Sequence, residues 1–388
     1  IIPTYFATNY IRYNSELHQA EIELRLNNPP GFLNHLKDAL KINPNGSTEL
    51  FKSRASFFLD NKQYKEAIND YEKAISLGSS NSTLYFSLGR AYAGANQYGK
   101  SNIAYDNSLK AVGEKISAVY FNKGLNYSNL NKHAEAQKNY TLYIKDQPSD
   151  PDGYFQRAKS IVTSESEDIN SALQDIDKAI DLEGDQVELK SYVLRSEIRK
   201  KIGDLNGAIS DISKVIDVNR SSSNLMYYAE RAYLYIDLND IPNAILDFNK
   251  IVSADTNSPE NYKLRATLYS YIEDYQNALV DLNKAISLDE KSPDLYKMRS
   301  GIFYELENYS NAMNDINIAI SLKADDPKLY FLRAEILIEN EDMADLKSTR
   351  RRREKAIADY SISINLDSEK ADYFKARGRA NFLLENYD

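Results

Sequence analysis

The sequence predicts an all-α protein, and three observations lead to this fold class. Blocks of similar sequence recur every 34 residues, apolar and small residues recur within each block at spacings of three and four, and glycine and proline are scarce at 14 and 10 of 388 residues. Spacings of three and four match the period of a helix, whereas a strand alternates every two residues. A fixed period of this length is typical of repeat proteins, in which each unit packs on its neighbours.

Composition narrows the functional classes. The chain has no cysteine, which excludes disulfides, thiol nucleophiles and zinc–thiolate sites. Its net charge of −9 argues against nucleic acid and anionic membrane as general partners. No apolar run approaches the ~18–20 residues of a membrane helix, so we expect no membrane insertion. For localisation, the cytoplasm is favoured, and the periplasm or the cell exterior stays open.

The repeat is clearest in the second half of the chain. Tyr228, Tyr262, Tyr296 and Tyr330 each open a similar block, and each step between them is 34 residues. A second block follows each of the first three, as in Asn277-Ala278-Leu279. Because apolar and small residues keep the helical spacing in both blocks, each unit is expected to form two antiparallel helices.

This pattern resembles the tetratricopeptide repeat, a 34-residue helix–turn–helix whose first helix we call helix A and whose second we call helix B. The family pattern has a large aromatic residue at position 4, a small residue at position 8 and alanine at position 20. Counting from unit starts at 48, 82, 117, 151, 189, 225, 259, 293, 327 and 371, position 4 holds Phe51, Tyr85, Tyr120, Tyr154, Tyr192, Tyr228, Tyr262, Tyr296, Tyr330 and Phe374. The resemblance implies a right-handed superhelical solenoid with helix A on the concave side.

The repeats divide the chain into three parts. Residues 1–12 form an N-terminal extension, 13–46 a degenerate repeat or capping hairpin, and 48–388 a solenoid of nine full repeats and a truncated tenth. The ninth repeat carries an insertion at about 339–354, which begins acidic and ends with Arg350–Arg353. A solvated extension of a helix, a docking site for an anionic partner and a nuclear-import-like signal are three interpretations of this segment.

Repeat positions 7 and 23 vary together. Seven units combine arginine with aspartate, as Arg54/Asp70, Arg157/Asp175, Arg195/Asp211, Arg231/Asp247, Arg265/Asp281, Arg299/Asp315 and Arg333/Asp359. The second unit has Leu88 and Ala104 at these positions, and the third has Lys123 and Asn139. Joint presence and joint absence predict that the arginine of helix A meets the aspartate of helix B, in a partly buried pair with a structural role that fixes helix register.

The resemblance places positions 2, 5, 9 and 12 of helix A on the concave side, and we call these positions the A-helix face. Its candidate peptide-binding residues are Phe86, Arg90, Phe121, Leu125, Phe155, Lys159, Met226 and Tyr233. Three successive phenylalanines at position 5, flanked by two cations, suit a peptide with apolar anchors and some acidic residues. Alternatively, these phenylalanines complete the packing between units. Later units carry charged residues at these positions, including Glu335, Lys375 and Arg379.

No motif indicates catalysis. The sequence has no glycine-rich phosphate loop, no nucleophile elbow and no histidine pair with metal-ligand spacing, so we predict no enzyme and no cofactor or metal. The leading hypothesis is a non-enzymatic scaffold that binds a peptide or protein partner in the concave groove. The alternative is a structural subunit that associates with itself, end to end, through its incomplete terminal repeats.

Overall fold

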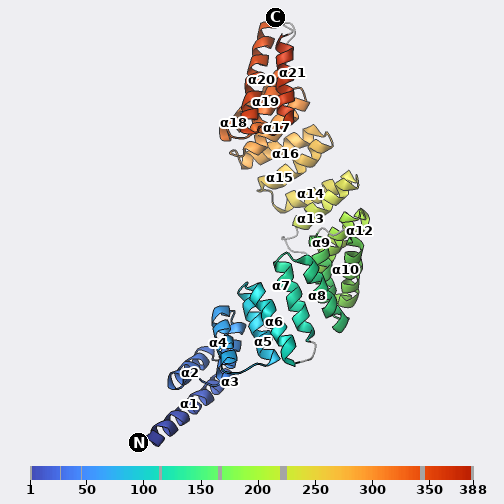
Figure 1. Ribbon diagram of the computed structural model, residues 1–388. Helices are drawn as coiled ribbons and strands as arrows, with labels where there is room; N and C mark the ends of the chain where they lie inside the picture. Colours follow the sequence, from blue (N-terminus) through green and yellow to red (C-terminus); the bar gives the residue numbers. More distant parts are fainter. Residues whose placement is uncertain are drawn as a thin grey trace. The chain divides into compact units, whose positions relative to one another are not determined.

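The computed structural model describes residues 2–26, 28–44, 46–112, 116–164, 168–218, 225–340 and 346–385. Across these ranges the chain forms 21 α-helices and one short 3₁₀ helix, Gly184–Gln186, and it contains no β-strand (Figure 1). The all-α prediction is therefore confirmed, and the fold is a helical-repeat solenoid. The right-handed sense of the superhelix stays a prediction.

The helices alternate between the two members of each repeat. Helices A are α3 (Thr48–Asp60), α5 (Ser82–Gly94), α7 (Ser117–Asn129), α9 (Pro151–Thr163), α11 (Leu189–Lys201), α13 (Leu225–Asp237), α15 (Pro259–Tyr271), α17 (Pro293–Glu305), α19 (Pro327–Glu339) and α21 (Ala371–Glu385). Helices B are α4 (Tyr64–Ser76), α6 (Tyr98–Val112), α8 (His133–Asp146), α10 (Ile169–Glu183), α12 (Leu205–Val218), α14 (Ile241–Ala254), α16 (Tyr275–Leu288), α18 (Tyr309–Leu322) and α20 (Leu346–Leu366). In most repeats helix A packs on its own helix B, which then packs on the next helix A. The chain divides into two compact units, Ile1–Asp211 and Ile212–Asp388.

The N-terminal hairpin consists of α1 (Ile2–Arg25) and α2 (Pro29–Ile42). Helix α1 is continuous, so no break in the backbone separates the predicted extension 1–12 from the degenerate repeat 13–46. Ala20 of α1 is buried in one apolar cluster with residues of α2 that follow the helical period. These α2 residues are Phe32, Leu36 and Ala39.

Local sequence explains where the helices begin and turn. Proline stands at the first position of α15, α17 and α19, where its missing N–H breaks no helical hydrogen bond. Position 15, in the turn between helices A and B, has a positive φ angle in seven repeats. These residues are Lys62, Asn96, Asn131, Gly203, Asn239, Glu273 and Glu307. A left-handed residue at this place ends helix A and turns the chain back.

The core depends on small residues at position 8. In the second repeat a Cβ atom placed on Gly89 would lie 2.5 Å from Cε1 of Tyr105, which is fully buried at position 24. Where position 24 is aliphatic, as at Ile176, position 8 is the larger Ala158, and both are buried. In the second repeat, helices A and B therefore approach closely because glycine at position 8 leaves room for the ring at position 24.

Part of the insertion in the ninth repeat forms the first turns of α20. Arg352 donates a hydrogen bond of 2.6 Å to the carbonyl of Asn340, and the buried Arg353 donates one of 2.5 Å to the carbonyl of Leu383 in α21. Residues 341–345 lie outside the described residues. Of the three interpretations, the helix extension matches this geometry, although Arg353 is buried rather than solvated. Two of the four arginines therefore bind backbone carbonyl groups.

Two kinds of feature are absent from the described residues. None of the helices described combines the length and the apolar character that a bilayer-spanning helix needs. The described side chains also include no cluster of three or more histidine, aspartate or glutamate residues that could hold a metal ion.

Candidate functional site

The structure brings together all seven arginine–aspartate pairs that the sequence singled out. In each pair Nε and one terminal nitrogen of the arginine donate to the two carboxylate oxygens, at 2.6–2.9 Å. Both partners belong to the same repeat. The hydrogen bonds to Asp315 raise the pKa of Arg299 above its usual value, and Asp281 has the same effect on Arg265.

In each of these pairs the aspartate side chain is buried more deeply than the arginine side chain. Arg231 is half-buried, as expected, but its partner Asp247 is only 3% exposed and so lies in the core. Asp281 and Asp315 are buried in the same way. The short side chain keeps the carboxylate close to helix B, where neighbouring helices shield it, and the arginine supplies the counter-charge that such burial requires. Asp247 is therefore an interior residue that holds helices together, closed to a binding partner.

Six of the seven arginines also bind the preceding repeat, a contact that the sequence analysis missed. The remaining terminal nitrogen donates to a polar side chain at position 25 of the preceding helix B, at 2.6–3.0 Å. The acceptors are Thr141, Asp177, Ser213, Asn249, Asn283 and Asn317. The signal was present in the sequence, because position 25 holds a short polar residue in all of these repeats. One guanidinium thus holds three helices from two repeats.

The third repeat uses a different pair. Lys123 forms an ion pair of 2.5 Å with Asp106 in α6, at position 25 of the preceding repeat. Asn139 instead donates to the backbone carbonyl of Glu135 within its own helix. Lys123 therefore keeps the contact with the preceding repeat, whereas Lys123 and Asn139 do not form the pair within the repeat that arginine and aspartate form elsewhere.

The predicted phenylalanine ladder is largely packed against helices B. The ring of Phe86 lies 5.6 Å from that of Tyr105, and the ring of Phe121 lies 4.9 Å from that of Tyr143. Both phenylalanines are half-buried. Phe155 is only 7% exposed and belongs to a core cluster. The packing interpretation therefore describes Phe155 better than a role as an open anchor.

The other candidates differ in accessibility. Arg90 and Lys159 are exposed, and Leu125 is half-buried. In α13, Met226 is 64% exposed and Tyr233 is 44% exposed. These last two residues are seven positions apart and so share one helix face. The A-helix face of α13 therefore presents large apolar side chains to solvent.

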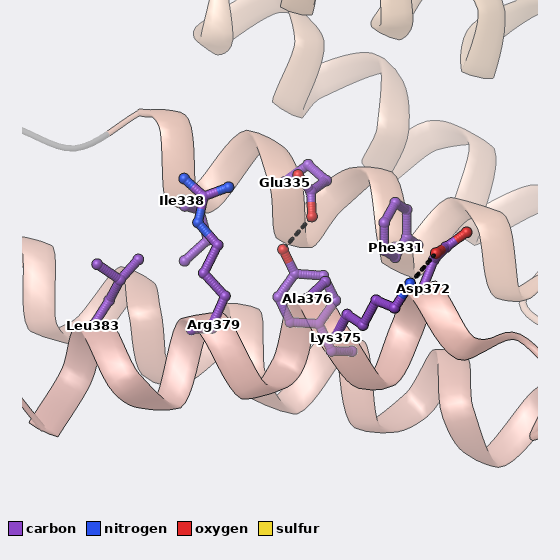
Figure 2. Close-up of a pocket in the computed structure, with 10 residues that line it drawn as sticks. Phe331, Glu335, Ile338, Asp372, Lys375, Ala376, Arg379 and Leu383 are labelled. Atoms are coloured by element: carbon purple, nitrogen blue, oxygen red, sulfur yellow. Dashed lines mark hydrogen bonds and ion pairs between the residues drawn. The ribbon is translucent and has the colours of Figure 1, made fainter.

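A hollow of about 280 Å³ lies between α19 and α21, and we call it the α19–α21 hollow. Residues of α19 and α21 line it, with Tyr360 of α20 between them. The lining includes Phe331, Glu335, Ile338, Lys375, Arg379 and Leu383. Figure 2 shows Lys375 and Arg379 extending from α21 beside the hollow, with Glu335 on the opposite helix. Five of these six residues occupy position 5, 9 or 12 of helix A.

The carboxylate of Glu335 in the hollow already accepts a hydrogen bond. The hydroxyl of Tyr360 donates a hydrogen bond to Glu335, drawn as a dashed line in Figure 2. Burial and the neighbouring Glu335 carboxylate raise the pKa of Tyr360 far above its usual value, so the hydroxyl stays protonated. The sequence could place Glu335 on the A-helix face but gave no indication of this bond.

Comparison with protein-family models identifies the repeat. A TPR repeat model matches residues 57–95, and a tetratricopeptide repeat model matches residues 117–149 and 260–292. The chain contains tetratricopeptide repeats. Such repeats typically form non-catalytic scaffolds for protein interaction, and this general role is the one they support for this chain. No curated protein matches the sequence.

Several solved structures are similar at low identity. A tetratricopeptide repeat protein from Parabacteroides merdae is 17% identical, with a TM-score of 0.46, covering 66% of this chain and 98% of that one. YrrB, described as a TPR protein with an unusual peptide-binding site, is 16% identical, with a TM-score of 0.41, covering 49% and 94%. MamA from Desulfovibrio magneticus is 17% identical, with a TM-score of 0.42, covering 45% and 95%.

Proposed function

We propose that this tetratricopeptide repeat chain is a scaffold that binds a peptide or protein partner on its A-helix face. One observation carries the proposal: the α19–α21 hollow lies at repeat positions that the sequence analysis assigned to binding. Phe331, Glu335 and Ile338 are positions 5, 9 and 12 of one repeat, and Lys375 and Arg379 are positions 5 and 9 of the next. The hollow combines apolar side chains with several charged ones, and polar groups that converge on a concave site are one mark of a ligand site.

The exposed apolar residues of α13 support the same face. Met226 and Tyr233 remain open to solvent at positions 2 and 9, although their neighbour Ala232 at position 8 is fully buried. Methionine and tyrosine are enriched where proteins meet partners, since one adapts its shape and the other combines an apolar ring with a polar tip. Within the unit Ile212–Asp388, the A-helix face thus offers both an apolar surface and a hollow.

The test is a selection of binding peptides from a random displayed library with the full chain, followed by affinity measurement for the selected peptides. Three variants block the A-helix face at separate places: Arg90→Glu, Tyr233→Glu and Ala376→Trp. We expect at least one of them to weaken each selected peptide about tenfold or more. Leu246→Glu and Val280→Glu are matched controls, because both residues are exposed on helices B. Peptides that respond only to the helix-B variants would exclude the A-helix face.

End-to-end self-association is the second candidate, and exposed apolar residues near both ends favour it. Tyr10 and Ile11 of α1 are exposed, as are Phe374 and Phe382 of α21. If these residues join copies of the chain, light scattering should show a mass that rises with concentration, and Phe382→Glu should abolish the rise. A constant monomer mass in the unmodified chain would exclude this candidate.

A further inference from the structure

The size of the α19–α21 hollow indicates what it can hold. At about 280 Å³ it is slightly smaller than the ~300–1,000 Å³ typical of pockets for whole small molecules. It lies between residues of two A helices, on the face proposed to bind peptides. A single side chain projecting from a bound peptide therefore fits this space better than a cofactor does.

The floor of the hollow is apolar and fixed. The ring of Phe331 packs on Tyr360 at 5.6 Å and on Tyr373 at 5.0 Å, and both tyrosines are buried. Ile338 and Leu383 extend the apolar lining toward the ends of α19 and α21. Because the packed rings hold the floor in place, an apolar side chain could enter with little rearrangement of the protein.

Three of the four charged side chains around the hollow have a hydrogen-bond or ion-pair partner. Glu335 accepts a hydrogen bond from Tyr360. Asp372 forms an ion pair of 3.7 Å with Lys375, and the side chains of Asp372 and Lys375 are both highly exposed. Arg379 is also exposed, yet it makes no hydrogen bond or ion pair with any residue that the structure describes. A guanidinium offers five donors, and its fork matches a carboxylate.

We propose that the α19–α21 hollow receives an apolar side chain of a partner peptide, and that Arg379 binds an aspartate or glutamate side chain close to it in the same peptide. This inference rests on the proposed function and names the partner's chemistry: an acidic segment with one apolar anchor. The carboxylate of the peptide replaces water around the guanidinium of Arg379. The apolar side chain of the peptide covers the ring of Phe331.

The inference is tested with the peptides selected by the full chain, synthesised with a fluorescent label and measured by anisotropy. Selected sequences should carry an aspartate or glutamate within about four residues of an aliphatic or aromatic residue. Arg379→Glu should weaken their binding about tenfold or more, and Ala376→Trp, which fills the hollow, should do the same. Arg351→Glu is the matched control, because it makes the same charge change at an exposed position of α20 outside the hollow; binding should stay within about twofold.

The outcomes separate this inference from the scaffold proposal. Peptides that lack acidic residues, or that bind the Arg379→Glu variant unchanged, overturn the inference. If such peptides lose affinity with Tyr233→Glu or Arg90→Glu, the scaffold proposal stands without it. A library that yields no binding peptide counts against both. Arg379 is exposed, so its variant should fold, and circular dichroism of each variant checks this point.

Discussion

Arg299 of α17 donates a hydrogen bond of 2.6 Å to Oδ1 of Asn283 in α16, which belongs to the preceding repeat. Its other donors hold both carboxylate oxygens of Asp315 in α18, at 2.6 and 2.8 Å. A guanidinium is planar, so these bonds define the relative position of three helices at once. The repetition of this geometry gives one side chain control over register within a repeat and between repeats.

The first prediction concerns the buried half of this arrangement. Asp315→Ala should lower the free energy of unfolding by about 3 kcal/mol, because it leaves the half-buried Arg299 without its counter-ion. Equilibrium denaturation measures the loss, and hydrogen exchange of the α17 and α18 amides locates it. Asn283→Ala is the control, since it removes one bond between repeats and should cost about 1 kcal/mol. Equal costs for the two variants would contradict a special role for the pair within the repeat.

The second prediction concerns close helix approach in the second repeat. Gly89→Ala should destabilise the protein by about 1–2 kcal/mol, because the new methyl group would displace the buried ring of Tyr105. Denaturation curves test this. The double variant Gly89→Ala/Tyr105→Ile should recover much of the loss, since Ala158 and Ile176 make the same combination in the fourth repeat.

Gly301 supplies the opposite expectation for the same substitution. It lies inside α17, and no atom lies within 4 Å of the Cβ that alanine would add, apart from its own chain neighbours and helix backbone. Gly301→Ala should therefore stabilise the protein by about 0.5–1 kcal/mol through helix propensity. If Gly89→Ala and Gly301→Ala shift stability in the same direction, close packing does not determine the residue at position 8.

The third prediction concerns the turn at position 15. Glu307 has a φ angle of +56°, a conformation that costs most residues about 1 kcal/mol but that asparagine adopts more readily. Asn96 and Asn239 occupy the same place in other repeats. Glu307→Asn should therefore raise the free energy of unfolding by about 0.5 kcal/mol, as measured by denaturation. Glu307→Val should lower it, and a neutral valine variant would contradict the argument.

The repeat period made most of the fold predictable. A step of 34 residues placed Tyr228, Tyr262, Tyr296 and Tyr330 at equivalent positions of successive units. The joint variation of positions 7 and 23 identified Arg265 and Asp281 as partners. Period and covariation within one chain are both local signals. They fix which residues face a neighbouring helix without any knowledge of three-dimensional distances.

The candidate site was less predictable, because burial depends on how neighbouring helices shield a face. Phe86 and Phe155 occupy the same repeat position, yet Phe86 is half-buried and Phe155 is buried in the core. Likewise, the run of arginines gave no sign that Arg353 would reach the end of α21 and bind the carbonyl of Leu383. The insertion changes the number of residues between the two segments that this contact joins. The 34-residue pattern therefore does not predict the contact.

The fourth prediction concerns alkaline pH and the fully buried Tyr140. Burial raises the pKa of Tyr140 from its ordinary value of 10.0 to about 12. The folded state therefore holds this proton more tightly than the unfolded state does. The protonated Tyr140 hydroxyl contributes fully to the free energy of unfolding below pH ~10. This contribution, about 3 kcal/mol in total, is lost as the pH rises toward 12. Unfolding free energies measured between pH 8 and 12 should show this fall.

The Tyr140→Phe variant isolates that contribution. It keeps the ring that packs against Phe121 and loses only a 3.2 Å hydrogen bond with Ser128, so its cost at pH 8 should be about 1 kcal/mol or less. Above pH 10 the free energy of unfolding of this variant should fall less steeply with pH than that of the unmodified chain. The difference in slope should correspond to about one bound proton. Tyr271→Phe, at a 69% exposed position, should leave the pH dependence unchanged. Parallel curves for the unmodified chain and Tyr140→Phe would show that the buried hydroxyl does not control alkaline stability.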